Sequence, residues 1–115
     1  MSIDRRHVGP RMSQIVVHGD TVYLAGQVAD DPSADVAGQT RQIVEKIDRY
    51  LAEAGTDKGK LLSATVWLSD IKTFNEMNGV WDAWVAPGNP PARACVEAKL
   101  AQPQYRVEIG VIAAR

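Results

Sequence analysis

Apolar residues occupy every second position in two short segments near the N-terminus, which is the pattern of half-buried β-strands. The segments run from Ser13 to His18 and from Thr21 to Val28. Gly19 and Asp20 lie between them, and a two-residue connection in which glycine supplies a positive φ is typical of a β-hairpin. Gly26, near the end of the second segment, indicates a bulge or a close approach of another part of the chain.

A spacing of three and four residues replaces this alternation from about Asp35 to Ala54 and predicts a long helix. Asp35 is placed to cap its first turn, and Gly55 is placed to end it. The predicted buried face of this helix consists of Val36, Thr40, Ile43, Val44, Ile47, Leu51 and Ala54.

A second helix is predicted from about Phe74 to Val85, and Thr73 and Glu76 have the spacing of a capping box. Its apolar stripe consists of Phe74, Met77, Trp81 and Trp84. Because large aromatic residues are usually buried, the stripe favours packing of the helix on a sheet over a ligand cage.

Three further strands complete the predicted order. They span Leu61 to Ser69, Ala92 to Leu100 and Tyr105 to Ala114. The order β-β-α-β-α-β-β predicts an α+β domain with both helices on one face of a mixed sheet. The other face of the sheet then needs a partner, and self-association is the simplest way to supply one.

Length and charge narrow the functional classes. The 115 residues fit a single domain, residues 1–115, and an ordinary share of apolar residues predicts a globular protein. Thirteen basic and fourteen acidic residues, scattered along the chain, give no electrostatic footprint for nucleic acid or for a membrane surface. No segment is typical of a signal peptide or of a membrane span. The single cysteine, Cys95, excludes an internal disulfide and suits the cytoplasm.

The candidate chemistry lies on the last two strands. Strand alternation places Arg93 and Cys95 on one side, together with Glu97 and Lys99, and turns the intervening apolar residues towards the helices. Glu108 is expected on the same helix-free side, so a guanidinium, a thiol and a carboxylate gather there. From this pattern alone, an ordinary surface ion pair between arginine and glutamate is the more common outcome, and Cys95 is as well explained as a small core residue.

Other catalytic arrangements find no support in the sequence. His7 and His18 lack metal-ligand spacing, so no metal site is expected. No glycine-rich phosphate loop is present, and nothing arranges serine, histidine and aspartate as a triad.

Several segments together resemble the RidA (YjgF) family, closest to its YoaB-like branch. The resembling segments are Pro91-Ala92-Arg93-Ala94-Cys95-Val96-Glu97, Val107-Glu108-Ile109, Ile112-Ala113-Ala114, Ala25-Gly26-Gln27, and the helix residues Phe74, Met77-Asn78 and Trp81 to Val85. They are collinear over nearly the whole chain, and the C-terminal motif is the most specific of them.

The resemblance implies a chorismate-mutase-like fold assembled as a homotrimer, with a central barrel and clefts between subunits. It implies hydrolysis of reactive 2-imino acids, or their enamine tautomers, to 2-keto acids and ammonia, with no metal and no cofactor. Arg93 matches the family's carboxylate-binding arginine, and Glu108 matches the glutamate that positions the attacking water. Backbone groups at Cys95 match substrate contacts, Asn78 matches a supporting residue, and Glu97 is the competing acid.

The same resemblance places Met12, Ala25 and Gly26 beside the substrate, and two of these depart from the family pattern. Met12 stands where the family often has tyrosine, and Ala25 where it often has serine, so two hydroxyl groups are absent. A non-catalytic trimer that binds or senses small carboxylates such as 2-keto acids is therefore the alternative function. A ribonuclease or translation-related role is a third hypothesis, which the mild net acidity disfavours.

Overall fold

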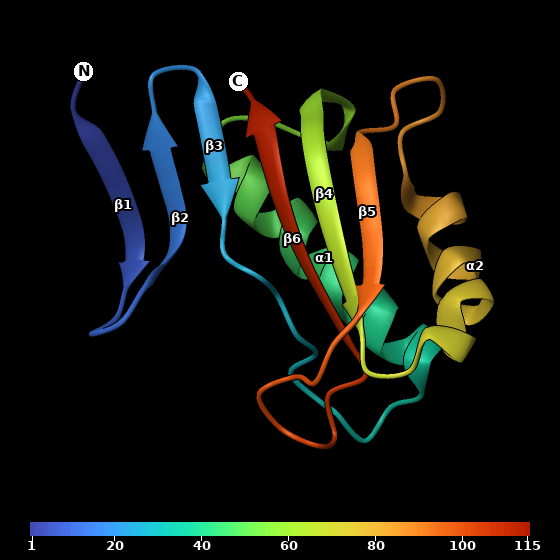
Figure 1. Cartoon of the computed structure of the whole chain (residues 1–115). Helices are drawn as coiled ribbons and strands as arrows, with labels where there is room; N and C mark the ends of the chain where they lie inside the picture. Colours follow the sequence, from blue (N-terminus) through green and yellow to red (C-terminus); the bar gives the residue numbers. More distant parts are fainter.

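A computed structural model describes all 115 residues as one six-stranded mixed sheet with two α-helices on one face (Figure 1). The strands lie in the order β1-β2-β3-β6-β4-β5, and only the β4–β5 pair is parallel. The elements are β1 (Ile3–Val8), β2 (Ser13–His18), β3 (Thr21–Leu24), α1 (Val36–Glu53), β4 (Leu61–Leu68), α2 (Phe74–Trp84), β5 (Ala92–Glu97) and β6 (Val107–Ala114). The α+β class and the placement of both helices are confirmed.

The predicted element order is wrong in one respect, because it lacks the first strand. β1 pairs antiparallel with β2 at the sheet edge, with Asp4 opposite Val17 and Arg6 opposite Ile15. Three of its six residues are charged and most are exposed, so it carries no apolar alternation that could predict it. The strand expected to reach Val28 also ends earlier, at Leu24.

The hairpin between β2 and β3 is confirmed. His18 lies opposite Thr21, and Gly19 between them has a φ of 60°. This left-handed conformation is accessible to glycine at little cost, which explains the residue at this turn.

Helix α1 begins and ends where the sequence predicts. Asp35 accepts a hydrogen bond from the Gly38 N–H at 2.8 Å, and Gly55, with a φ of 83°, follows the last turn. For α2 the predicted capping box is wrong, because a short 3₁₀ turn leads directly into the helix. The Thr73 hydroxyl donates to a carbonyl within that turn, and Glu76 instead accepts a hydrogen bond from the backbone of α1.

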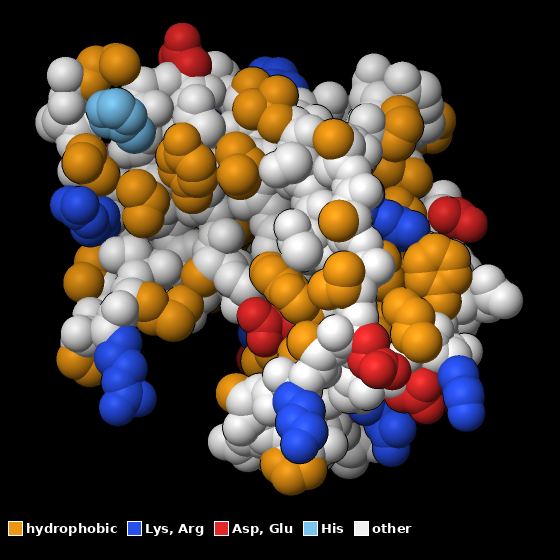
Figure 2. Space-filling model, viewed as in Figure 1, with side chains coloured by type: hydrophobic (Ala, Val, Ile, Leu, Met, Phe, Trp, Pro, Cys, Tyr) orange, Lys and Arg blue, Asp and Glu red, His pale blue; other side chains and the backbone are white.

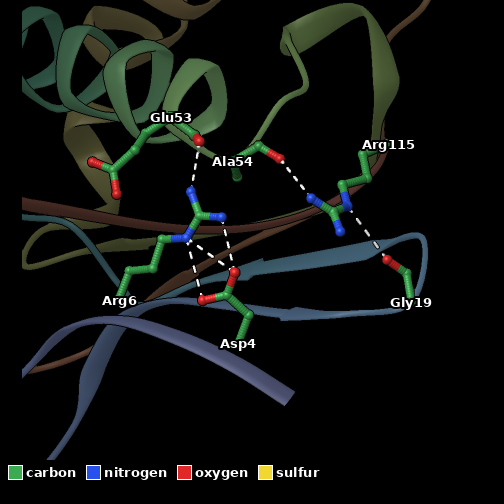
Figure 3. A network of polar contacts seen from close by, with 6 residues as sticks. All are labelled: Asp4, Arg6, Gly19, Glu53, Ala54 and Arg115. Carbon is green, nitrogen blue, oxygen red and sulfur yellow. Dashed lines mark hydrogen bonds and ion pairs between the residues drawn. The ribbon is translucent and has the colours of Figure 1, made fainter. Parts of the chain in front are cut away.

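Two arginines from opposite ends of the chain bind the C-terminal end of α1 (Figure 3). Arg6 on β1 donates to the Glu53 carbonyl at 2.7 Å, and Arg115 donates to the Ala54 carbonyl at 3.3 Å. Positive charge at this end of a helix complements its dipole and satisfies carbonyls that have no helical partner. Arg6 is itself held by Asp4 at 2.8 Å, so the edge strand is tied to the helix as well as to the sheet.

Gln39 joins two loops inside the protein. Its side chain is fully buried and makes four contacts with backbone groups. The amide nitrogen lies 3.0 to 3.1 Å from the carbonyl oxygens of Pro32, Ala34 and Gln104, so its two N–H groups serve three acceptors and one N–H is shared. The side-chain oxygen accepts from the Arg106 N–H at 2.9 Å.

The core lies between the helices and the alternate residues of β2, β3, β4 and β6 that face them. The opposite face of the sheet has no helix over it. Figure 2 shows hydrophobic side chains spread across this face. The strand register assigns to it Val16, Tyr23, Ala94, Val96 and Ile112. We call it the open face; the prediction that a partner covers it stays a prediction. Neither helix is both long and apolar enough to cross a membrane.

Candidate functional site

The two residues predicted to carry the chemistry lie on opposite faces of the sheet. Val96, Trp67 and Glu108 form one row across β5, β4 and β6, and Cys95, Val66 and Ile109 form the next. Val66 and Ile109 are fully buried beneath the helices. The row that contains Glu108 therefore faces the open side, while Cys95, and Arg93 two residues before it, face the helices.

The prediction that the guanidinium, the thiol and the carboxylate share the helix-free face is therefore wrong. The division of the β5 residues into two alternating sets was predicted correctly, but the set that faces the helices was not. Val96, expected towards the helices, is 46% exposed on the open face. On its helix side, this edge strand lies against the outer margin of α2, so a polar side chain there can keep part of its surface in water.

Arg93 is half-buried and contacts three residues of α2. Its Nη1 donates to Asn78 Oδ1 at 2.8 Å. Its Cζ lies 5.1 Å from the ring centroid of Trp81 and 5.8 Å from that of Phe74. No carboxylate lies within 4 Å, so the expected surface ion pair is absent and the hypothesis that explained Arg93 by it is wrong. A partly desolvated, planar guanidinium without a counter-ion is suited to binding a carboxylate.

Cys95 lies next to Arg93 on the same face and packs against the core. Burial raises the pKa of its thiol, and the charge of Arg93 opposes this only in part. The thiol therefore stays protonated and is a weak nucleophile. Glu97, the competing acid, accepts a hydrogen bond from the Ile71 backbone N–H at 3.0 Å instead of pairing with Arg93.

Glu108 lies half-buried on the open face against the backbone of Gly26. A Cβ built on Gly26 would overlap Glu108 Oε2 and lie 3.0 Å from Cδ, which confirms the predicted close approach at this glycine. The carboxyl group forms no ion pair within the chain, and burial raises its pKa. A carboxyl group whose pKa is raised towards neutrality is a better general base than an ordinary glutamate.

Gln27 fixes the segment that carries Gly26. It belongs to the Ala25-Gly26-Gln27 motif, but it was not expected at the site. The Gln27 backbone exchanges hydrogen bonds with Ile109 at 2.8 and 3.0 Å. Its side-chain amide donates to Gln14 Oε1 at 2.8 Å and to the Ala25 carbonyl at 3.0 Å. The available signal in the sequence was a polar residue inside a predicted strand. In the structure this glutamine is 3% exposed, and a polar side chain buried to that degree has to be hydrogen-bonded.

The predicted substrate-binding residues thus form two groups. Arg93, Cys95 and Asn78 lie together on the helix side, whereas Gly26 contacts Glu108. Met12 is in the turn between β1 and β2, with an exposed side chain, and its carbonyl accepts from the Gly9 N–H.

A surface hollow elsewhere on the chain contains neither group. It lies between α1 and α2, has a volume of about 480 Å³, and is lined by residues that include Arg41, Glu45, Lys58 and Trp84. The Trp84 indole donates to Asp48 there at 3.0 Å. It contains none of the residues that the sequence assigned to the substrate site.

Comparisons with known proteins agree with the resemblance seen in the sequence. The family model described as Endoribonuclease L-PSP matches residues 6–115. A RutC family protein of Haemophilus ducreyi is 46% identical over 112 residues, covering 97% of this chain and 96% of the relative. The RutC family protein YoaB of Escherichia coli is 40% identical over 114 residues, covering 99% of both chains. A crystal structure of a YjgF family member from Neisseria meningitidis superposes with a TM-score of 0.97 at 46% identity, covering 100% of this chain and 96% of that one.

Proposed function

The chain belongs to the Endoribonuclease L-PSP family, which includes the RutC and YjgF (RidA) proteins, and we propose that it hydrolyses reactive 2-imino acids, or their enamine tautomers, to 2-keto acids and ammonia. We propose that it does so in the cytoplasm as a homotrimer, without a metal or a bound cofactor. The observation that carries the proposal is the half-buried Arg93 guanidinium, which has aromatic neighbours and no carboxylate of its own.

The proposed reaction needs one anion-binding group and one proton acceptor. Arg93 binds the substrate carboxylate, Asn78 steadies the guanidinium, and backbone groups at Cys95 bind the substrate. Glu108 takes a proton from water as the water oxygen adds to the imine carbon. Glu108 passes this proton to the nitrogen, which gives a carbinolamine with one hydroxyl and one amino group on the same carbon. The hydroxyl proton then moves by way of Glu108 to the amino group as the C–N bond breaks, so that a C=O bond forms, ammonia leaves and the 2-keto acid remains. The raised pKa of Glu108 supports this role.

Arg93 and Glu108 face opposite sides of one sheet, so both can reach one substrate only if they come from different copies of the chain. In the proposed trimer the open faces surround a central barrel, and each cleft combines Arg93 of one subunit with Glu108, Gly26, Ala25 and Met12 of its neighbour. The apolar side chains of the open face support this assembly, because apolar side chains gathered on one exposed face commonly mark an interface.

An imine-trapping assay tests the activity. A threonine dehydratase generates the imine, semicarbazide competes for it, and the release of 2-ketobutyrate is followed with and without the protein. We expect faster release with wild type and no acceleration with Arg93→Ala, because the carboxylate has lost its partner. If wild type gives no acceleration, deamination of this substrate is ruled out.

Mixed oligomers test whether the site lies between subunits. Arg93→Ala and Glu108→Gln are each expected to be inactive, and co-refolding them in equal amounts should restore about a quarter of the sites, because each site takes one residue from each neighbour. If both residues served one substrate from a single chain, mixing would restore nothing.

The second candidate is a non-catalytic binder or sensor of small carboxylates. It is favoured by the absence of hydroxyl groups at Met12 and Ala25, which leaves Arg93 as the main polar contact for a ligand. Binding of 2-ketobutyrate that is lost in Arg93→Ala, together with no imine turnover by wild type, would decide for this candidate.

A further inference from the structure

The aromatic stripe of α2 does more than pack the helix on the sheet. Phe74, Asn78 and Trp81 are spaced by four and three residues, so they share one face of the helix, and all three contact the guanidinium of Arg93. Trp81 is 5% exposed and belongs to the core, whereas Phe74 is 37% exposed at the rim. The sequence predicted only packing for this stripe.

We propose that Phe74 and Trp81 are positioning residues which, together with Asn78, hold Arg93 so that the Nε–Nη2 edge of its guanidinium faces a carboxylate ligand. The inference that these residues position Arg93 depends only on the contacts described above. The identity of the ligand, a 2-imino or 2-keto acid, rests on the proposed function.

The free edge follows from the hydrogen bonds of the guanidinium. Arginine has five N–H donors in a planar fork. One at Nη1 is used by Asn78, while Nε and Nη2 have no partner in the protein. The Nε–H and Nη2–H groups point in parallel, so this edge can bind both oxygens of one carboxylate. A long arginine side chain has many rotamers, and contacts from one rigid helix reduce them before the ligand arrives.

Trp84 is an aromatic residue of the same helix whose side chain has other partners. Its indole N–H is bound by Asp48, Lys58 lies 5.5 Å from its ring centroid, and it is packed against Trp81. It has no contact with Arg93. The cation–aromatic contact of Trp84 is with Lys58, whereas those of Trp81 and Phe74 are with the half-buried guanidinium of Arg93. Partial burial strengthens such contacts.

The test uses one readout that needs no ligand and one that does. Protons over an aromatic ring are shielded, so the Nε–H signal of Arg93 should be shifted upfield in NMR spectra of the wild-type protein. We expect Trp81→Leu to remove much of that shift and to weaken binding of 2-ketobutyrate about tenfold, by calorimetry. Trp81→Phe keeps a ring and should stay within about threefold of wild type. Trp84→Phe is the matched control and should change neither readout.

An unchanged Arg93 Nε–H signal in Trp81→Leu would overturn the proposal, and so would equal loss of binding in Trp81→Phe and Trp81→Leu. If Trp81→Leu does not fold, Phe74→Leu at the more exposed ring gives the same two readouts. The proposed function fails separately: a wild-type protein that neither binds 2-ketobutyrate nor hydrolyses the imine would refute it, while the Nε–H signal still decides the positioning.

Discussion

Replacing Gly26 with alanine should separate catalysis from stability. Gly26 does not have a positive φ, so alanine fits its backbone. The added methyl group, however, would overlap Glu108 Oε2 and lie 3.0 Å from Cδ. The carboxylate has to rotate away to make room, so the substitution perturbs the proposed base without touching it chemically.

The size of the effect follows from this geometry. We expect the carboxylate to move by about 1 Å, and a misplacement of this size can cost about 100-fold in rate. An added methyl group destabilises a protein by about 1–3 kcal/mol when its neighbours cannot move, but the end of the Glu108 side chain can move. Replacing glycine with alanine also reduces the conformational entropy of the unfolded chain, which stabilises the folded state by about 0.4–1 kcal/mol. The free energy of unfolding should therefore change little while kcat/KM in the imine-trapping assay falls about 10- to 100-fold.

Gly79 provides the matched control. It lies inside α2, and a Cβ there would meet no atom within 4 Å. Gly79→Ala should stabilise the helix by about 1 kcal/mol and leave kcat/KM unchanged. The reasoning is refuted if Gly26→Ala keeps wild-type kcat/KM, because the position of the Glu108 carboxylate would then not matter to the reaction.

Three further outcomes are expected. Gln39→Met should lower the free energy of unfolding in urea by about 3 kcal/mol, because about three hydrogen bonds of about 1 kcal/mol each are lost, whereas the exposed Gln102→Met should leave it unchanged. Burial holds the folded pKa of Glu108 above its ordinary value of 4.5, so its contribution to stability is fully present below pH 4.5 and is lost as pH rises through the folded pKa. Glu108→Gln should therefore gain stability relative to wild type as the pH of the urea titration is raised, and a constant difference would contradict the burial argument. Cys95 should react with iodoacetamide more slowly than free cysteine because burial raises its pKa, and Cys95→Ser should keep kcat/KM within about threefold if its backbone is what binds.

The elements that could be predicted from the sequence are those in which burial of one face makes apolar residues recur at a regular spacing. Helix α1 buries one face over 18 residues, so its apolar positions recur every three or four residues, and capping chemistry marks both ends. None of the side chains of β1 is buried. The strand is held by its pairing with β2 and by the contacts of Arg6, and neither interaction produces a pattern of apolar residues in the sequence. The capping box of α2 failed for a related reason, since a preceding 3₁₀ turn is invisible in residue spacing.

The face of Arg93 could not be predicted from alternation, because alternation separates the residues of a strand into two sets without saying which set meets the helices. The register of the parallel β4–β5 pair decides this. Ala64 and Val66 of β4 are buried under the helices, and their partners in β5 are Arg93 and Cys95. Parallel neighbours need a crossover connection that packs on the sheet, and here that connection is α2. The side chains of β5 on that face must therefore meet α2. The parallel pairing of two strands thus places a guanidinium against an aromatic helix and leaves Glu108 on the other side of the sheet, away from Arg93 of the same chain.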